Sequence, residues 1–138
     1  MKDVKDEEWP ILGVCQGLEV ISIILNDGDI DTLDIIDIYG QSLPIDWNVH
    51  DHTAESRLFQ TFPDYLVEAM DNDGLALHAH TYSISTDTFN KTKGLNEFMK
   101  VTQTDVWKRP SDGKKIKFIA SMEANDYPIF TTMYHPEY

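Results

Sequence analysis

The sequence predicts a single-domain α/β fold, and three observations favour this class. An apolar run at residues 9–14 leads through a turn into residues with helical spacing, which is the order of a strand followed by a helix. Further strand and helix patterns follow along the chain. The length of 138 residues suits one domain, and no linker, repeat or low-complexity tract divides the sequence.

The first strand and the first helix flank the only cysteine. Because residues 9–14 form an unbroken apolar run, we expect a central strand that is covered on both faces. Apolar residues then recur at helical spacing from Leu18 to Leu25, and Asn26-Asp27-Gly28 is expected to end this helix.

Short elements alternate through the middle of the chain. Residues 29–38 predict one or two half-exposed strands with an irregularity near Ile35, and residues 54–59 predict a short helix. Pro63 suits the first turn of another helix. A strand follows over residues 75–85, with His78 and His80 on one face.

The last third predicts a short helix and then three strands joined by tight connections. The helix lies near residues 95–99 and the strands span residues 101–107, 115–122 and 127–134. Turn residues at 109–113 and 124–126 separate the strands.

Gly13 and Gly17 flank Cys15 in the pattern Gly-x-Cys-x-Gly, the cysteine form of a nucleophile elbow. A side chain at either glycine is expected to clash in so sharp a strand-to-helix turn. The helix N-terminus is expected to favour the thiolate of Cys15, and the backbone N–H of Gln16 is a candidate oxyanion donor. The alternative is a cysteine that serves only as a small apolar residue.

A base for this cysteine is predicted at the end of the last strand. His135 and Glu137 lie on the same side of an extended chain, and Pro136 stiffens the link between them. Glu137 can then orient the imidazole of His135, which gives a triad in the order Cys, His, Glu. Taken alone, His135 is also compatible with a plain polar residue at a strand end.

The elbow and five other stretches resemble gamma-glutamyl hydrolase, a family of the class I glutamine amidotransferase-like superfamily. The five stretches are Ser56-Arg57-Leu58-Phe59-Gln60-Thr61-Phe62-Pro63, His80-Thr81-Tyr82-Ser83, Gly113-Lys114-Lys115-Ile116-Lys117-Phe118-Ile119-Ala120-Ser121-Met122-Glu123, Asp126-Tyr127-Pro128 and His135-Pro136-Glu137. They follow the family's order along nearly the whole chain. Glu19 stands where the glutamine-hydrolysing relatives usually carry Gln.

The resemblance implies a three-layer α/β/α, flavodoxin-like fold of the glutamine amidotransferase type. It also implies that residues 1–138 are a partial domain that begins just before the nucleophile strand. In the family, further strands and a glycine-rich loop with a second oxyanion donor precede the elbow, and a short stretch follows the final His-Pro-Glu. We therefore expect an incomplete sheet.

The resemblance assigns the reacting groups position by position. It implies that Cys15 attacks the gamma-glutamyl amide, that His135 is the general base and later the acid, and that Glu137 orients His135. His80 would be the second active-site histidine, and Glu19 would lie beside the nucleophile in the substrate pocket.

The implied activity is hydrolysis of the gamma-linked glutamate tails of folates and antifolates, with water and without cofactor or metal. The resemblance further implies a homodimer and a lysosomal, vacuolar or extracellular location. Two alternatives stay open: a glutamine-hydrolysing amidotransferase domain, against which Glu19 speaks, and a truncated, non-catalytic remnant.

Composition restricts the partners. The 24 acidic and 11 basic side chains give a net charge of −13, which argues against nucleic acid and anionic membranes. No apolar run reaches the ~20 residues that span a bilayer, and residues 1–8 do not resemble a signal peptide. Asn90-Lys91-Thr92 is a candidate N-glycosylation site.

Metal ligation is the interpretation that residue spacing supports least. The pairs His50/His52 and His78/His80 are compatible with a shared ion, but neither has a third ligand at fixed spacing. The acidic residues in the segment 27–31 resemble the start of a calcium loop whose later ligand positions are not matched. We therefore expect no metal.

Overall fold

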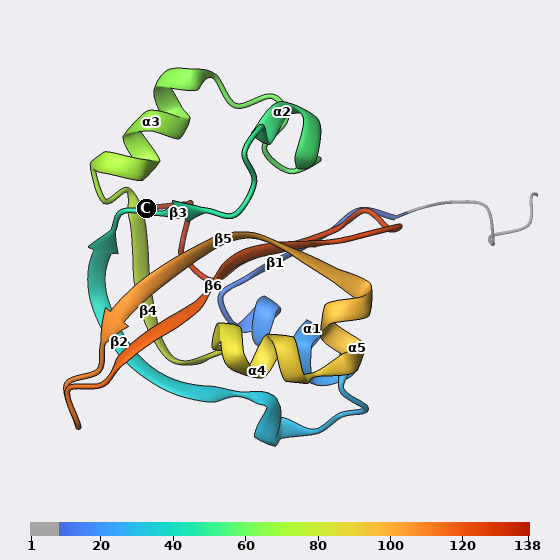
Figure 1. Ribbon diagram of the computed structural model, residues 1–138, viewed down its shortest axis with the longest axis vertical. Helices are drawn as coiled ribbons and strands as arrows, with labels where there is room; N and C mark the ends of the chain where they lie inside the picture. The colour runs from blue at the N-terminus through green and yellow to red at the C-terminus, as the bar shows by residue number, and fades with distance from the viewer. Residues whose placement is uncertain (1–8) are drawn as a thin grey trace, which may run out of the picture.

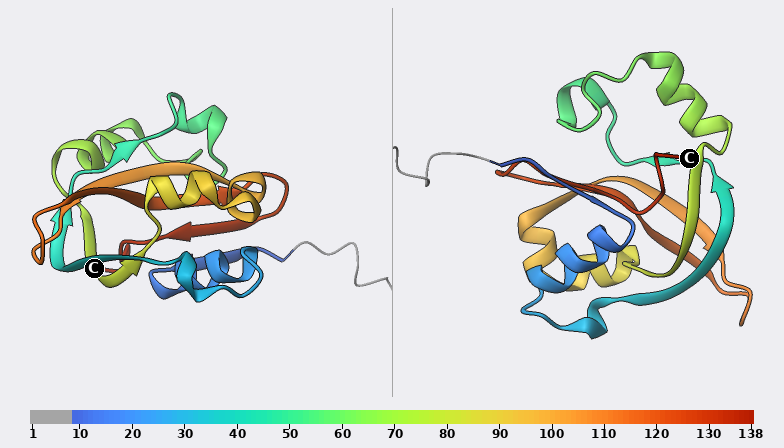
Figure 2. Two further views of the ribbon diagram at one scale, coloured as in Figure 1. Left: turned by 60° about the horizontal axis from the view of Figure 1, so that its bottom comes forward. Right: turned by 180° about the vertical axis from the view of Figure 1, so that it is seen from behind.

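The computed structural model describes residues 9–138 and has three layers (Figures 1 and 2). The elements in chain order are β1 (Ile11–Val14), α1 (Gln16–Leu25), the 3-10 helix η2 (Ile30–Thr32), β2 (Asp34–Leu43), β3 (Asp46–Trp47), α2 (His52–Glu55), α3 (Asp64–Asn72), β4 (Ala76–Ser83), α4 (Thr86–Lys91), α5 (Lys93–Phe98), β5 (Met99–Lys108), β6 (Lys115–Ala124) and β7 (Ile129–Thr132). Helices α1, α4 and α5 lie on one side of the main sheet, and α2 and α3 lie on the other. The predicted α/β class and layering are confirmed.

The main sheet is mixed. Its strand order is β1-β7-β6-β5-β3, and β2 and β4 form a separate antiparallel pair. Within the main sheet β1 and β7 are parallel, while the other pairings are antiparallel. The connections at residues 109–114 and 125–128 are too short for a parallel crossover, so β5, β6 and β7 must alternate in direction. The all-parallel pattern of a doubly wound sheet is therefore absent from residues 9–138.

Strand β1 is an edge strand, so the prediction of a central strand covered on both faces is wrong for this chain. In this strand Ile11 is 48% exposed and Leu12 is 58% exposed, although Gly13 is buried. Within the described part of the chain, β7 is the only strand that pairs with β1. An apolar run is buried only when a second strand and its helix cover it.

Local sequence signals place several boundaries correctly. Helix α1 ends at Leu25 and is capped by Asn26, and both Asp27 and Gly28 have positive φ, at 55° and 83°. Helix α3 begins directly after Pro63. The predicted irregularity near Ile35 is a bulge in β2. Predictions based only on the alternation of polar and apolar residues were less accurate.

Three segments differ from the predictions. The helix expected over residues 54–59 lies instead at His52–Glu55, because the Asp51 side chain caps it by accepting from the N–H groups of Thr53 and Ala54. Residues 30–32 form the 3-10 helix η2 instead of a strand, because the Asp29 side chain accepts a hydrogen bond from the Asp31 N–H and turns the chain. Helix α4 was not predicted, and it is capped by Ser85, whose Oγ accepts from the Thr88 N–H.

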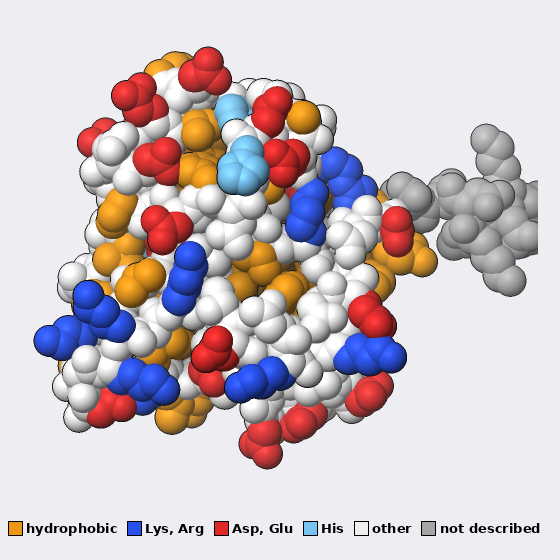
Figure 3. All heavy atoms as spheres, viewed as in Figure 1, with side chains coloured by type: hydrophobic (Ala, Val, Ile, Leu, Met, Phe, Trp, Pro, Cys, Tyr) orange, Lys and Arg blue, Asp and Glu red, His pale blue; other side chains and the backbone are white. Residues whose placement is uncertain are grey.

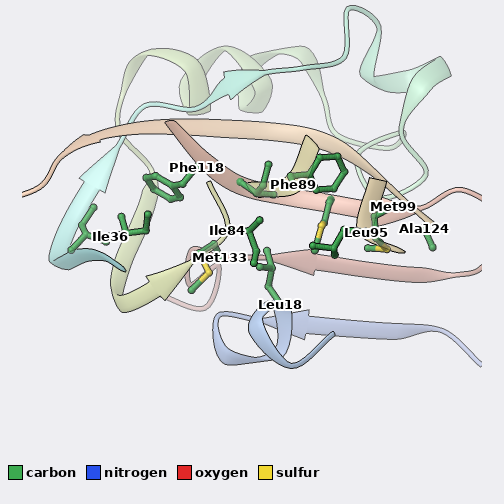
Figure 4. Close-up of a cluster of buried hydrophobic side chains, with 12 residues drawn as sticks. Leu18, Ile36, Ile84, Phe89, Leu95, Met99, Phe118, Ala124 and Met133 are labelled. Atoms are coloured by element: carbon green, nitrogen blue, oxygen red, sulfur yellow. The ribbon is translucent and has the colours of Figure 1, made fainter. Parts of the chain in front are cut away.

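The largest hydrophobic cluster lies between the main sheet and the helices α1, α4 and α5 (Figure 4). It joins α1, which follows the cysteine, to the strands β6 and β5. Its fully or almost fully buried members are Leu18, Ile36, Ile38, Ile84, Phe89, Leu95, Met99, Phe118, Ile119, Met122, Ala124 and Met133. This packing fixes the start of α1 relative to the sheet. No helix in residues 9–138 has both the length and the hydrophobicity needed to cross a membrane.

On the opposite side of the sheet, the buried carboxylate of Glu123 holds the loop that follows α2. It accepts hydrogen bonds from Ser56 Oγ at 2.9 Å, from the Arg57 N–H at 3.2 Å and from the Leu58 N–H at 3.1 Å, and Lys100 Nζ lies 3.2 Å away. Burial acts to raise the pKa of Glu123, but these hydrogen bonds lower it below its usual range. Two stretches that carried the family resemblance therefore meet at this carboxylate.

Helices α1 and α5 approach each other so closely at Gly94 that a side chain has no room. A Cβ at this position would lie 1.9 Å from the carbonyl oxygen of Leu25. Gly94 thus permits the contact that places α5 beside α1.

We predict that Gly94→Ala lowers the free energy of unfolding by at least ~1–3 kcal/mol, because the helices must separate to admit the methyl group. Urea denaturation of the variant and the wild type measures the change. Gly17→Ala is the matched control, because a Cβ there meets no atom within 4 Å and Ala favours helix. Equal losses of stability in the two variants would contradict the prediction.

Candidate active site

Cys15 lies at a sharp turn between β1 and α1, as the elbow pattern predicts. Its backbone has φ 51° and ψ −104°, a conformation that residues with a Cβ rarely adopt. Its N–H donates to the carbonyl oxygen of Thr132 at 2.7 Å, so the turn is anchored to the end of β7. Strained backbone of this kind is typical of functional positions that the surrounding structure holds in place.

The two flanking glycines contribute differently. At Gly13 a Cβ would lie 2.9 Å from the carbonyl carbon of Gly17 and 3.0 Å from Ile21 Cδ1, so the expected clash is confirmed. At Gly17 a Cβ would meet no atom within 4 Å, so the expected clash is wrong for the residues described. The first turn of α1 passes directly over Gly13 and leaves Gly17 on its open side.

The environment of Cys15 favours the thiol over the thiolate at rest. Burial of the half-exposed side chain raises its pKa, and the nearby carboxylate of Glu19 raises it further. The carboxylate of Glu137 also raises the pKa, and the backbone N–H of Gln16 lowers it without outweighing these three effects. The first backbone N–H of the helix thus favours the thiolate, as expected, but burial and the nearby carboxylates outweigh it, and the sulfur needs a base.

His135 and Glu137 form the pair that their spacing predicts. The Nδ1 of His135 lies 2.8 Å from Oε1 of Glu137, and the two side chains are 22% and 55% exposed. Because a carboxylate only accepts, Nδ1 carries a proton, and in the neutral ring Nε2 is then the acceptor nitrogen. The His135 N–H also donates to the Leu77 carbonyl of β4 at 2.9 Å.

The parallel pairing of β1 with β7 brings this pair to the side of the nucleophile. Val14 is the register partner of Thr132, so Cys15 and His135 both follow the carboxyl ends of adjacent parallel strands. No hydrogen bond joins the Cys15 sulfur to His135 within residues 9–138. The catalytic roles of Cys15, His135 and Glu137 stay predictions.

His80 is 4% exposed, and both of its ring nitrogens have partners inside the protein. Its Nδ1 lies 2.9 Å from the carbonyl oxygen of Tyr82, and its Nε2 lies 3.1 Å from Nδ1 of His78. The predicted face of β4 is therefore the buried one. Direct contact of His80 with a substrate stays a prediction, to which the present geometry lends no support.

A buried ionisable pair next to His80 was missed by sequence reasoning. The Nε2 of His78 lies 2.7 Å from Oδ2 of Asp105, and both side chains are fully buried. Burial raises the pKa of Asp105 to about 8 and lowers the pKa of His78 to about 4 and that of His80 to about 3. A signal was available, because alternation in β4 puts both histidines on one face.

The remaining sequence candidates lie elsewhere. Asn90 is exposed in α4, which is compatible with glycosylation. The ring of His52 lies 3.0 Å from the Phe62 carbonyl oxygen. No group of three or more His, Cys, Asp or Glu side chains suited to a metal is present in the described part of the chain.

Two cavities on the surface could hold a ligand. A mostly apolar pocket of about 330 Å³ is lined by residues before and after His135 and by side chains of α3 and its flanks. Its lining residues are Phe62, Leu66, Met70, Leu75, Tyr134, Pro136 and Tyr138. A wider groove of about 570 Å³ opens between α4, α5 and β5, where Figure 3 shows a hollow with hydrophobic side chains at its floor. Its rim carries amide and ammonium groups from Asn48, Asn90, Asn96, Asn125, Lys100 and Lys117.

Similar proteins are known over nearly the whole chain. Gamma-glutamyl hydrolase B of Dictyostelium discoideum is 29% identical over 98% of this chain and 37% of its own length. The gamma-glutamyl hydrolases of Bos taurus and Homo sapiens are 33% and 31% identical over 94% of this chain. The chain is homologous to gamma-glutamyl hydrolases. It spans about 37% of the length of these relatives.

A solved structure supports the fold. A protein described as one of the subunits of a GMP synthase from Thermoplasma acidophilum matches with a TM-score of 0.52 and 14% identity, over 98% of this chain and 51% of that chain. This chain therefore shares its α/β fold with that protein. No protein-family model matches the chain.

We predict that Glu19→Gln speeds the alkylation of Cys15 by iodoacetamide at neutral pH roughly two- to tenfold. Loss of the adjacent negative charge lowers the pKa of the thiol and so raises the thiolate fraction. Glu68→Gln on α3 removes the same charge away from the elbow and serves as the control. Identical rates for Glu19→Gln and wild type would refute the assigned cause.

We also predict that the buried trio gives stability a maximum near pH 6.5. Asp105 has a folded pKa raised from 3.8 to about 8, so its contribution is present at low pH and is lost as pH rises toward 8. His78 has a folded pKa lowered from 6.5 to about 4, and His80 behaves likewise, so their contributions are present above pH 6.5 and are lost as pH falls.

Urea unfolding at several pH values measures this dependence. Between pH 6.5 and pH 8 the wild type is expected to lose ~1–2 kcal/mol relative to Asp105→Asn, because only the wild type holds a proton there that the unfolded chain has released. Parallel pH profiles for the two proteins would contradict it.

Proposed function

We propose that the protein hydrolyses the gamma-glutamyl bonds of folate polyglutamates with Cys15 as the nucleophile. One observation carries the proposal: the β1–β7 pairing brings a strained cysteine elbow and an oriented His135–Glu137 pair to the same edge of the sheet. Homology to gamma-glutamyl hydrolases supplies the bond and the substrate class.

The first half of the reaction is acyl transfer to sulfur. Nε2 of His135 takes the proton of the Cys15 thiol, which overcomes the raised pKa of the sulfur, and the thiolate attacks the gamma-amide carbonyl. The N–H of Gln16 is aimed at this space and shares the negative charge of the tetrahedral oxygen. The His135 imidazolium, held by Glu137, then protonates the leaving amine and a thioester remains.

The second half is hydrolysis. Nε2 of His135 takes a proton from water, the hydroxide attacks the thioester carbonyl, and Cys15 leaves as a thiolate that is reprotonated by His135. The product carries a free gamma-carboxylate. No metal or cofactor has a step in this scheme.

The surroundings of the pair fit such a substrate. The apolar pocket lined by Tyr134 and Pro136, the sequence neighbours of His135, offers space to the aromatic part of a folate. Glu19 lies next to the nucleophile on the first turn of α1. A homodimer and a lysosomal, vacuolar or extracellular location belong to the same proposal and rest on the family resemblance alone.

The test is release of glutamate from a folate pentaglutamate at mildly acidic pH. We predict that Cys15→Ala abolishes release and that His135→Asn lowers it by on the order of 10³-fold or more, because each removes a reacting group. His50→Asn is the matched control, since His50 is exposed in a loop and should leave the rate unchanged.

Other outcomes decide between the alternatives. Ammonia release from free glutamine that depends on Cys15 would replace the proposal with a glutaminase. Absence of both reactions from a chain that circular dichroism shows to be folded would favour a non-catalytic protein.

A further inference from the structure

The buried trio of Asp105, His78 and His80 forms a continuous chain of hydrogen bonds that ends at the backbone. The links measure 2.7 Å from Asp105 to His78, 3.1 Å from His78 to His80, and 2.9 Å from His80 to the carbonyl of Tyr82. The rings pack edge-to-face against one another and against Phe118. All three residues are at most 4% exposed, so the protons on their side chains are held mainly by partners inside the protein.

The carbonyl of Tyr82 sets the direction of the whole chain. A carbonyl oxygen only accepts, so Nδ1 of His80 must carry a proton. In a neutral His80 the other nitrogen, Nε2, is then a bare acceptor. The facing Nδ1 of His78 must therefore be the donor.

One labile proton remains, and it lies between Nε2 of His78 and Oδ2 of Asp105. It sits on the carboxyl group or on the imidazole, and the pair has no net charge in either case. Burial, which disfavours both charged forms, keeps the carboxyl protonated and the imidazole neutral. In both arrangements His78 donates to His80, so the tautomer of His80 does not change.

The chain also links the two sheets. Asp105 belongs to β5 of the main sheet, whereas His78 and His80 belong to β4 of the two-stranded pair. Residue Leu77, next to His78, accepts the backbone N–H of His135. The Asp105–His78 link therefore holds in place the strand that supports His135 from outside the main sheet.

We propose that Asp105 and His78 are positioning residues of the candidate active site, which fix His80 in its Nδ1-protonated tautomer and hold β4 against the backbone of His135. This inference rests on the proposed function for its catalytic consequence. The other charged or titratable groups near the trio are Asp46 on β3 and Tyr134 and His135 after β7.

The tautomer is tested on the wild-type protein without any substrate. Heteronuclear NMR of protein labelled in its histidine rings should show His80 with a protonated Nδ1 and a bare Nε2 at every pH between about 5 and 8. A His80 that carries its proton on Nε2, or that titrates near pH 6.5 like a free histidine, would overturn the proposal.

The link to His135 is tested by hydrogen exchange of two backbone amides in Asp105→Leu, which keeps the branching and the number of heavy atoms of the side chain and removes the hydrogen bond. Exchange of the His135 N–H should speed up at least about tenfold, because its acceptor on β4 is released. The Cys15 N–H, bonded to Thr132 within the main sheet, should keep its rate and is the internal control. Equal acceleration of both amides would indicate general destabilisation and refute positioning.

Activity measurements on two variants of Asp105 distinguish a positioning role from a merely structural one. Asp105→Leu should lower kcat by up to ~10²-fold with little change in KM. Asp105→Asn should retain most of the activity, because its amide N–H donates to Nε2 of His78 as the protonated carboxyl does. Equal losses in the two variants would overturn the proposal. If the wild type shows the predicted tautomer and exchange but releases no glutamate, the proposed hydrolase function fails and the hydrogen-bond chain is upheld.

Discussion

The parallel pairing of β1 with β7 is the constraint on which the candidate site depends. It is a single backbone register, with Val14 opposite Thr132, and it puts the ends of two distant segments side by side. The cysteine turn is tied into it by the bond from the Cys15 N–H to Thr132, and the histidine follows three residues later. The core beneath α1 then prevents the turn from relaxing, so that strain at Cys15 is maintained by packing throughout the layer (Figure 4).

Sequence reasoning succeeded where a few neighbouring residues determine the geometry. The elbow follows from the crowding at Gly13, and the His135–Glu137 contact follows from the alternation of an extended chain. The end of α1 at Asn26 and the start of α3 after Pro63 depend on local backbone preferences. These features required no knowledge of what lies across the sheet, and they include most of the residues that the proposed chemistry uses.

The failures concern features that depend on partners distant in sequence. The exposure of β1 depends on which strands pair with it. The free space around Gly17 depends on how α1 packs on the sheet. The carboxylates of Glu123 and Asp105 look like ordinary strand residues until the structure buries them with partners 65 and 27 positions away. Composition and periodicity contain no information on such pairings. The pKa of Cys15 was hard to predict for the same reason, because burial and the carboxylate of Glu19 affect it more than the helix N-terminus does.

The main-chain anchor at Tyr82 has a consequence for how such a site varies among related proteins. Because the last acceptor is a carbonyl oxygen, any residue that keeps the strand conformation serves at position 82, and its side chain is 45% exposed. The positions occupied by Asp105 and His78 have no such freedom. If either residue is replaced, the other loses its partner in a buried hydrogen bond. Substitutions at these two positions are therefore expected to be accepted together and to be selected against singly, so that they covary across an alignment while position 82 drifts.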